Sequence, residues 1–129
     1  MLSLIFIFLA GVCNSIMDVV SFRYEVSFFK KFSKKWFDPK ISWTNKWKDG
    51  NPNKGEKFIG SSTVLVSFTD AWHFFKSLMI FFIILGIVFY KPLINNYIDM
   101  IILYGTFTVT FELFWSKIWI KKNWLWIIY

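Results

Sequence analysis

The sequence has 129 residues, which is the length of a single domain, and 56% of them are hydrophobic. Soluble domains are roughly 45–50% apolar, and a water-soluble core of this size could not bury an aromatic content of 23%. The formal net charge is +7, and the single cysteine, Cys13, excludes an internal disulfide. Composition therefore predicts an all-α integral membrane protein with one domain, residues 1–129.

The first predicted element is a transmembrane helix over about residues 1–23. Asp18 carries the only charged side chain before Arg23, and about 20 mostly apolar residues are enough to cross a bilayer. No Lys or Arg precedes the apolar run, which makes it a poor cleavable signal peptide. We therefore expect a retained helix, followed by a short interfacial helix within residues 26–37.

A basic loop is predicted next, over about residues 28–61. Nine lysines and three acids lie between Phe29 and Ser61. Such a loop can bind nucleic-acid phosphates, but Lys-rich loops beside hydrophobic spans stay cytoplasmic and contact anionic lipid headgroups. We favour lipid over nucleic acid, because the interleaved tryptophans suit headgroup anchoring better than base stacking. The candidate headgroup contacts are Lys46, Lys48, Lys54 and Lys57.

A second transmembrane helix is predicted over about residues 63–90, with the cluster Ser61, Ser62 and Thr63 as its N-cap. The uncharged stretch 77–90 is too short to cross a hydrocarbon core of about 30 Å. The helix must therefore carry His73 and its neighbours into the membrane or just below it.

The third predicted transmembrane helix covers about residues 93–116. It follows the helix-breaking pair Lys91 and Pro92 so closely that it should form an antiparallel hairpin with the second helix. The tail, residues 117–129, is too short to span the membrane and is expected at the interface.

The lysine distribution predicts the orientation. The loop and the tail are both basic, whereas the N-terminus and the Lys91 turn are nearly neutral. Since Lys-rich segments stay inside, we expect the N-terminus outside, the basic loop inside and the C-terminus inside, in a multi-pass protein of the inner (cytoplasmic) membrane.

Four ionisable side chains are predicted to share one layer near the inner surface. At about 1.5 Å per helical residue, Asp18 lies about 26 Å from the outer surface, His73 about 27 Å, and Asp70 and Glu112 about 31 Å. Helical spacing also places polar residues on one stripe of each of the first two helices. These stripes should face each other rather than lipid, and they supply the supporting polar candidates Asn14, Ser15 and Ser67, to which Trp72 is added.

One hypothesis from this layer is a metal-dependent enzyme that acts on a lipid headgroup or a similar interfacial substrate. Asp70 and His73 are one helical turn apart, and Asp18 would complete an oxygen-rich set of ligands suited to a hard divalent ion. Glu112 would serve as a base. The candidate catalytic residues are thus Asp70, His73 and Glu112, and the candidate metal ligands are Asp18, Asp70 and His73.

Two other interpretations stay open. The buried charges can be structural pairs in which Asp18 or Glu112 faces Arg23 or Lys76. The chain can also be a small oligomeric membrane protein, such as a pore, a holin-like lesion former or an accessory subunit of a larger membrane complex.

Two segments carry a resemblance to a known group of proteins. They are residues 11–18 (GVCNSIMD) and 41–75, with the patterns Trp43-x-Asn45-Lys46, Gly55-Glu56-Lys57-Phe58 and Thr69-Asp70-x-Trp72-His73. These segments resemble short uncharacterised membrane proteins of bacteria and their phages. The resemblance implies no activity, but it groups Asn14, Asp18, Asp70, Trp72 and His73 as positions of interest.

Overall fold

The structure is a computed structural model, and it describes residues 1–121. Three long helices form the bundle: α1 (Leu2–Phe22), α4 (Ala71–Val88) and α5 (Asn96–Leu113), which continues as a π-helical turn, η7 (Phe114–Ile118). Each is long and apolar enough to cross a membrane. No strand forms within residues 1–121, so the predicted all-α architecture with three candidate spans is confirmed.

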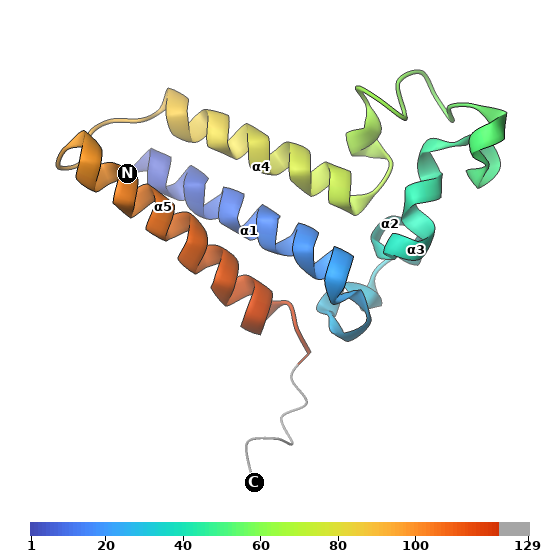
Figure 1. Cartoon of the computed structure of the whole chain (residues 1–129), viewed down its shortest axis with the longest axis horizontal. Coiled ribbons are helices and arrows are strands. Elements are labelled where there is room, and N and C mark those ends of the chain that lie inside the picture. The colour runs from blue at the N-terminus through green and yellow to red at the C-terminus, as the bar shows by residue number, and fades with distance from the viewer. Residues whose placement is uncertain (122–129) are drawn as a thin grey trace, which may run out of the picture.

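α1 is the middle helix of the bundle. It packs against both α4 and α5 (Figure 1). The packing against α5 is close because Gly11 has no side chain: a Cβ there would lie 2.9 Å from the carbonyl oxygen of Phe107. At Gly86 of α4 a Cβ would lie 3.2 Å from Cδ1 of the Ile7 side chain of α1. Small residues at such crossings let membrane helices approach each other.

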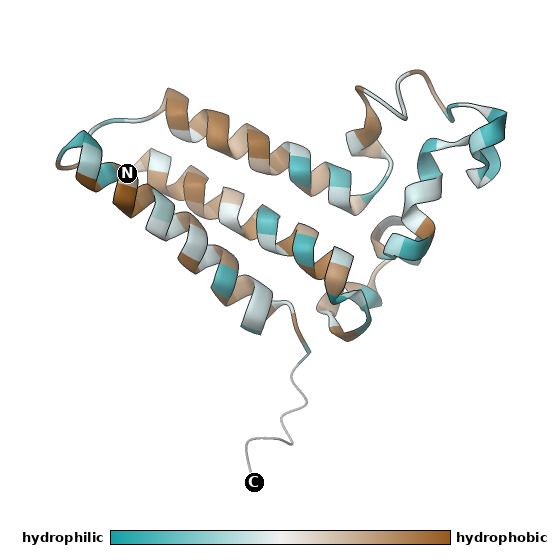
Figure 2. Cartoon of the chain, in the orientation of Figure 1, coloured by the Kyte–Doolittle hydropathy of each residue, from teal (hydrophilic) through white to brown (hydrophobic). Residues whose placement is uncertain are grey.

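The apolar faces that α4 and α5 do not turn toward α1 are exposed. Only 11% of each of these two helices is buried, against 50% of α1. Figure 2 shows hydrophobic colour along much of α4 and hydrophilic colour mainly at the outer end of residues 23–70. In a bilayer, lipid would cover these outer faces.

Residues 23–70, here named the connecting segment, lie at the end of the bundle where α1 ends and α4 begins (Figure 1). Short helical turns make up most of it: η1 (Tyr24–Val26), η2 (Phe28–Lys31), α2 (Lys34–Phe37), α3 (Pro39–Ser42), η3 (Trp43–Lys46), η4 (Lys48–Gly50), η5 (Pro52–Lys54) and η6 (Val66–Phe68). α2 falls within residues 26–37, where a short helix was expected, and α3 follows it with Asp38 as its N-cap.

The predicted start of the second long helix at Ser61–Thr63 is wrong. Residues 61–65 form turns, and α4 begins only at Ala71. The serine cluster does not cap a helix. Instead, the backbone N–H and the hydroxyl of Ser62 both donate hydrogen bonds to the Glu56 carboxylate. The cap of α4 is Asp70. Thr63 and Ser67 therefore do not share a helix face with Asp70.

The turn between α4 and α5 is built around Asp99. This side chain is fully buried, and its carboxylate accepts hydrogen bonds from the Tyr90 hydroxyl (2.8 Å) and from the backbone N–H groups of Leu93 (2.7 Å) and Ile94 (3.1 Å). Asn95 caps α5, so the helix starts at Asn96, three residues later than predicted. Asp99 thus holds the hairpin closed.

After α5 the chain returns to the end of α1. Trp119 and Phe28 share a backbone hydrogen bond (2.8 Å), as do Lys121 and Val26 (3.0 Å). The Trp119 indole also donates to the Ser15 hydroxyl at 2.9 Å. The part of the predicted interfacial tail beyond residue 121 lies outside the described residues.

The basic loop is folded and not extended. Trp47 and Glu56 pair as an isolated β-bridge, and Lys57 donates to the carbonyl of Lys46 at 2.9 Å. Asp49 and Gly50, with φ of 51° and 70°, reverse the chain between them. The buried Ser61 hydroxyl donates to the same Lys46 carbonyl at 2.7 Å. Hydrogen bonds within the loop therefore hold it in a folded conformation.

The closeness of α1 and α5 gives a first test. Gly11→Ala would place a Cβ against backbone and should lower the free energy of unfolding by about 1–3 kcal/mol. Gly105→Ala on α5 is the matched control, because nothing lies within 4 Å of its Cβ position. Unfolding titrations in detergent measure both; equal stabilities would contradict the packing.

The hairpin turn gives a second test. Asp99→Ala leaves three donors without their acceptor, whereas Tyr90→Phe removes only one of the three bonds. We expect both variants to lower the thermal unfolding temperature, and Asp99→Ala to lower it more. If Asp99→Ala unfolds at the wild-type temperature, the carboxylate does not hold the turn.

The loop gives a third test, based on pH. Hydrogen bonds from Ser62 and from the Gly60 backbone lower the pKa of Glu56 below its ordinary value of 4.5. The stabilisation is therefore present above pH 4.5 and is lost as the pH falls through the lowered pKa. Hydrogen exchange of the amides in residues 56–62, corrected for intrinsic rate, should show protection that falls over this range. Glu56→Gln should lack this pH dependence; the same dependence in both proteins would contradict the assignment.

Candidate functional site

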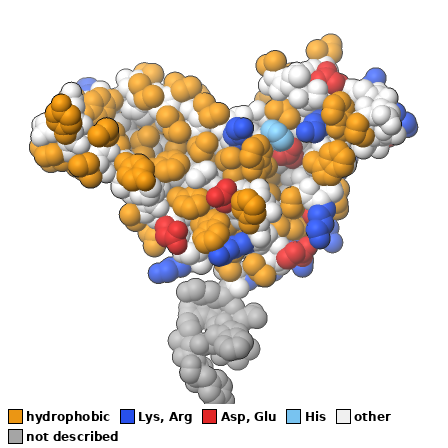
Figure 3. All heavy atoms as spheres, viewed as in Figure 1, with side chains coloured by type: hydrophobic (Ala, Val, Ile, Leu, Met, Phe, Trp, Pro, Cys, Tyr) orange, Lys and Arg blue, Asp and Glu red, His pale blue; other side chains and the backbone are white. Residues whose placement is uncertain are grey.

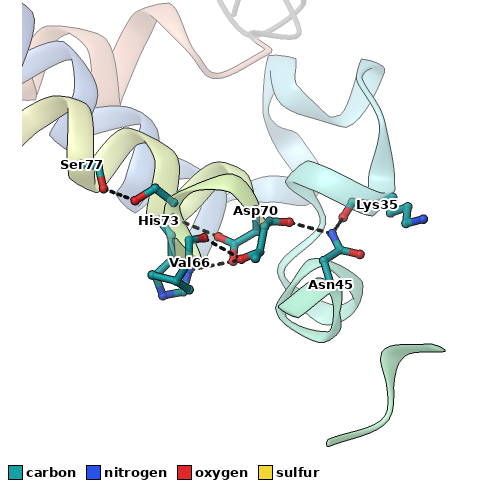
Figure 4. Close-up of polar contacts among 8 residues, drawn as sticks. Lys35, Asn45, Val66, Asp70, His73 and Ser77 are labelled. Atoms are coloured by element: carbon teal, nitrogen blue, oxygen red, sulfur yellow. Dashed lines mark hydrogen bonds and ion pairs between the residues drawn. The ribbon is translucent and has the colours of Figure 1, made fainter. Parts of the chain in front are cut away.

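A carboxylate and an imidazole are joined at the start of α4. Asp70 Oδ1 accepts a hydrogen bond from the backbone N–H of His73 at 3.0 Å, and Asp70 Oδ2 lies 2.7 Å from His73 Nδ1 (Figure 4). The backbone bond is an N-cap, which satisfies one of the free N–H groups of the first helical turn. One side chain thus starts the helix and orients the ring.

The hydrogen bond to Asp70 sets which nitrogen of the His73 ring carries the proton. Because Asp70 is an acceptor, Nδ1 of a neutral His73 carries the proton, and Nε2 is left with a lone pair. Asp70 is 3% exposed, whereas the His73 side chain is 28% exposed. The buried carboxylate therefore supports a partly exposed ring whose Nε2 has no hydrogen-bond partner among the described residues.

The imidazole lies in a notch of the molecular surface. Figure 3 shows the one histidine, in pale blue, between the bundle and the outer part of the connecting segment, with basic side chains on either side. The Trp72 ring meets it edge-on, with the centroids 4.9 Å apart, and Lys76 Nζ lies 4.9 Å from the Trp72 centroid. The Ser67 and Ser77 hydroxyls share a hydrogen bond nearby (Figure 4). Two predicted supporting residues, Ser67 and Trp72, are thus in the region.

The predicted base, Glu112, and the third predicted ligand, Asp18, do not join the pair. Glu112 is exposed on α5, which packs on α1 separately from α4. Asp18 is half-buried on α1. Within residues 1–121 no group of three or more His, Cys, Asp or Glu side chains is close enough to hold a metal ion. The donor set predicted from Asp18, Asp70 and His73 is therefore not assembled.

The predicted structural ion pairs are not formed either. The Arg23 guanidinium lies 3.5 Å from the centroid of the Trp115 ring, and Lys76 lies over Trp72. The ion pairs among the described residues are Lys30–Glu25, Lys54–Asp49 and Asp70–His73. Cations near the helix ends contact aromatic rings here.

Two predicted polar residues of α1 have different positions. The buried Ser15 hydroxyl donates to the carbonyl of Val12 at 2.6 Å and accepts from Trp119, so it serves helix packing. Asn14 is half-buried. Neither residue is held to Asp70 or His73 by a hydrogen bond in the described part of the chain.

Asn45 is a site residue that spacing along the sequence does not identify. Its amide Nδ2 donates to the carbonyl of Thr69 at 3.0 Å and also to the carbonyl of Lys35 (Figure 4). It therefore joins α2 to the residue just before Asp70. The only sequence signal was its place in the Trp43-x-Asn45-Lys46 pattern.

Comparison with known proteins supplies no relative: no family model, curated protein or solved structure matches the chain. The resemblance of residues 11–18 and 41–75 to short bacterial and phage membrane proteins therefore stays a prediction. The functional argument must come from the geometry of Asp70, His73 and their surroundings.

Proposed function

We propose that this chain is an enzyme of the cytoplasmic membrane in which Asp70 and His73 carry out general acid–base catalysis on a lipid headgroup or a similar interfacial substrate. The observation that carries the proposal is the 2.7 Å contact between Asp70 Oδ2 and His73 Nδ1, which leaves Nε2 open. The lysine-rich connecting segment would face the cytoplasm and the N-terminus the outside, as the positive-inside tendency predicts.

The chemistry follows from the two ring nitrogens. Nε2 takes a proton from water or from a substrate hydroxyl, while the oxygen attacks an acyl carbon or a phosphorus atom of the substrate. The imidazolium then returns this proton to the departing oxygen. Asp70 keeps the ring in the correct tautomer and stabilises its positive charge in between.

The residues present do not fit the metal-dependent form of this hypothesis. Both carboxylate oxygens of Asp70 contact His73, and Asp18 and Glu112 are not gathered with them. A divalent ion at Nε2 would have one nitrogen ligand from the described residues. The proposal therefore uses the dyad alone.

The alternative function, a small oligomeric membrane protein, is favoured by a different observation. An apolar groove of 760 Å³ runs between α4 and α5 over α1, lined by residues such as Ile83, Met100 and Phe107. A helix of another subunit or of a larger complex can occupy such a groove. In that case changes at Asp70 or His73 would alter oligomeric state or accumulation and leave lipid chemistry unaffected.

The test is lipid turnover by the purified protein in vesicles of a bacterial total lipid extract, followed by mass spectrometry. His73→Ala should slow the reaction by about 10²–10⁴-fold, the usual contribution of a general base. Asp70→Asn should also slow it while keeping α4 intact, because Asn caps helices as well as Asp does.

Ser116→Ala is the control: its hydroxyl donates to the Glu112 carbonyl of α5, away from the pair, and the variant should react at the wild-type rate. Two results would refute the enzyme proposal: no lipid species consumed by the wild type, or equal consumption by wild type and His73→Ala. A changed oligomeric state in His73→Ala without loss of turnover would support the alternative.

A further inference from the structure

Two cavities in the connecting segment share three polar residues. The smaller cavity has a volume of 260 Å³ and the larger one 640 Å³, and both are lined by Lys35, Asn45 and Lys57. The remaining lining of the smaller cavity is Trp36, Phe58, Phe68 and Thr69. Two lysines and an amide thus meet at one hollow that is otherwise mostly aromatic.

The smaller cavity is cationic and has no acid in its lining. Neither Lys35 nor Lys57 belongs to any ion pair formed within residues 1–121. Asp49, which lines the larger cavity, is already paired with Lys54 at 2.9 Å. Both lysines are exposed, and Figure 4 shows the Lys35 side chain directed away from Asp70. Two positive charges at the rim of a cavity whose lining holds no acid attract an anion. A ligand with negative charge therefore suits this cavity.

The cavity is next to the catalytic pair. Thr69, which lines it, directly precedes Asp70 in the chain. Asn45 holds this wall in place through its bonds to the Thr69 and Lys35 carbonyls. Figure 4 shows Asn45 between Lys35 and the start of α4. The cavity and the start of α4 therefore share a wall at Thr69.

The aromatic residues that line the smaller cavity indicate which kind of molecule carries the anion. Phe58 is 39% exposed and Phe68 64% exposed, and both line the cavity beside Trp36. Exposed rings next to ammonium groups are typical of the membrane interface, where the ring lies among the lipids and the ammonium contacts phosphate. Arrangement and charge both point to phosphate as the recognised group.

We propose that Lys35 and Lys57 bind the phosphate group of the substrate at the cavity that adjoins the start of α4. This inference rests on the proposed function and names its substrate class, a phosphate ester. The inference also revises the set of lysines predicted to contact headgroups. Lys57 stays in the set and Lys35 is added to it. Lys54 forms an ion pair with Asp49 instead. Lys46 and Lys48 are absent from the lining of both cavities.

The experiment measures binding, separately from turnover. Detergent-purified protein carrying His73→Ala is titrated with phosphatidylglycerol and analysed by native mass spectrometry. The double substitution Lys35→Gln and Lys57→Gln should weaken binding about ten- to thirtyfold, as expected for two lysines that contact phosphate. The double substitution Lys48→Gln and Lys54→Gln removes the same charge and is the matched control, with binding close to that of the parent. Equal melting temperatures of the variants establish that the fold is kept.

A second arm identifies the source of the phosphate. Glycerol phosphate, which is water-soluble, is added as a competitor. Competition would extend the substrate class to soluble phosphate esters, and its absence would restrict the class to phospholipids; both support the inference. Equal loss of binding in the two double variants, or no loss in either, would overturn it.

The outcomes separate this inference from the proposed function. Lysine-dependent binding in a protein without turnover would leave a phosphate site and refute the enzyme. Turnover that depends on His73 but not on Lys35 and Lys57 would keep the enzyme and refute the phosphate site.

Discussion

The hydrogen bonds of the Asp70 carboxylate are the interactions on which both α4 and the candidate site depend. A helix that enters a membrane needs partners for its first N–H groups, and a negative charge at this end is also favoured by the helix dipole. Asp70 meets both needs through the His73 N–H and uses its second oxygen for the imidazole. The fold therefore fixes the ring orientation that acid–base chemistry requires.

The central position of α1 determines which helices can contribute side chains to the candidate site. α4 and α5 pack on α1 with glycines at both crossings, and the Ser15 hydroxyl of α1 is bonded to the Trp119 indole. The exposed Glu112 on α5 is separated from His73 by this arrangement. The site is consequently formed by α4 and the connecting segment, which are neighbours in the chain, and not by three helices.

Hydrophobic runs were sufficient to predict three helices, because apolar length is a local property of the sequence. The start of α4 was not predictable in this way, since Ser61 and Ser62 bond to Lys46 and Glu56 across a folded loop. The Asp70–His73 pairing was found from their three-residue spacing, although the geometry is that of a cap and its third helical residue. The burial of Asp99 was not predictable from the sequence either, because it depends on a turn that folds backbone donors onto the carboxylate.

The late start of α4 also decides the depth of the proposed chemistry. Its 18 residues extend about 27 Å, close to the roughly 30 Å of a hydrocarbon core, so Asp70 would lie in the headgroup layer and not within the lipid chains. A charged pair at that depth avoids the cost of burial in hydrocarbon and can exchange protons with water. Phosphate groups of lipids occupy the same layer, where Lys35 and Lys57 have no acidic partner among the described residues. If Lys35 and Lys57 bind the substrate phosphate as proposed, the base and the anion lie in this one layer, and no cluster of charges is needed inside the membrane.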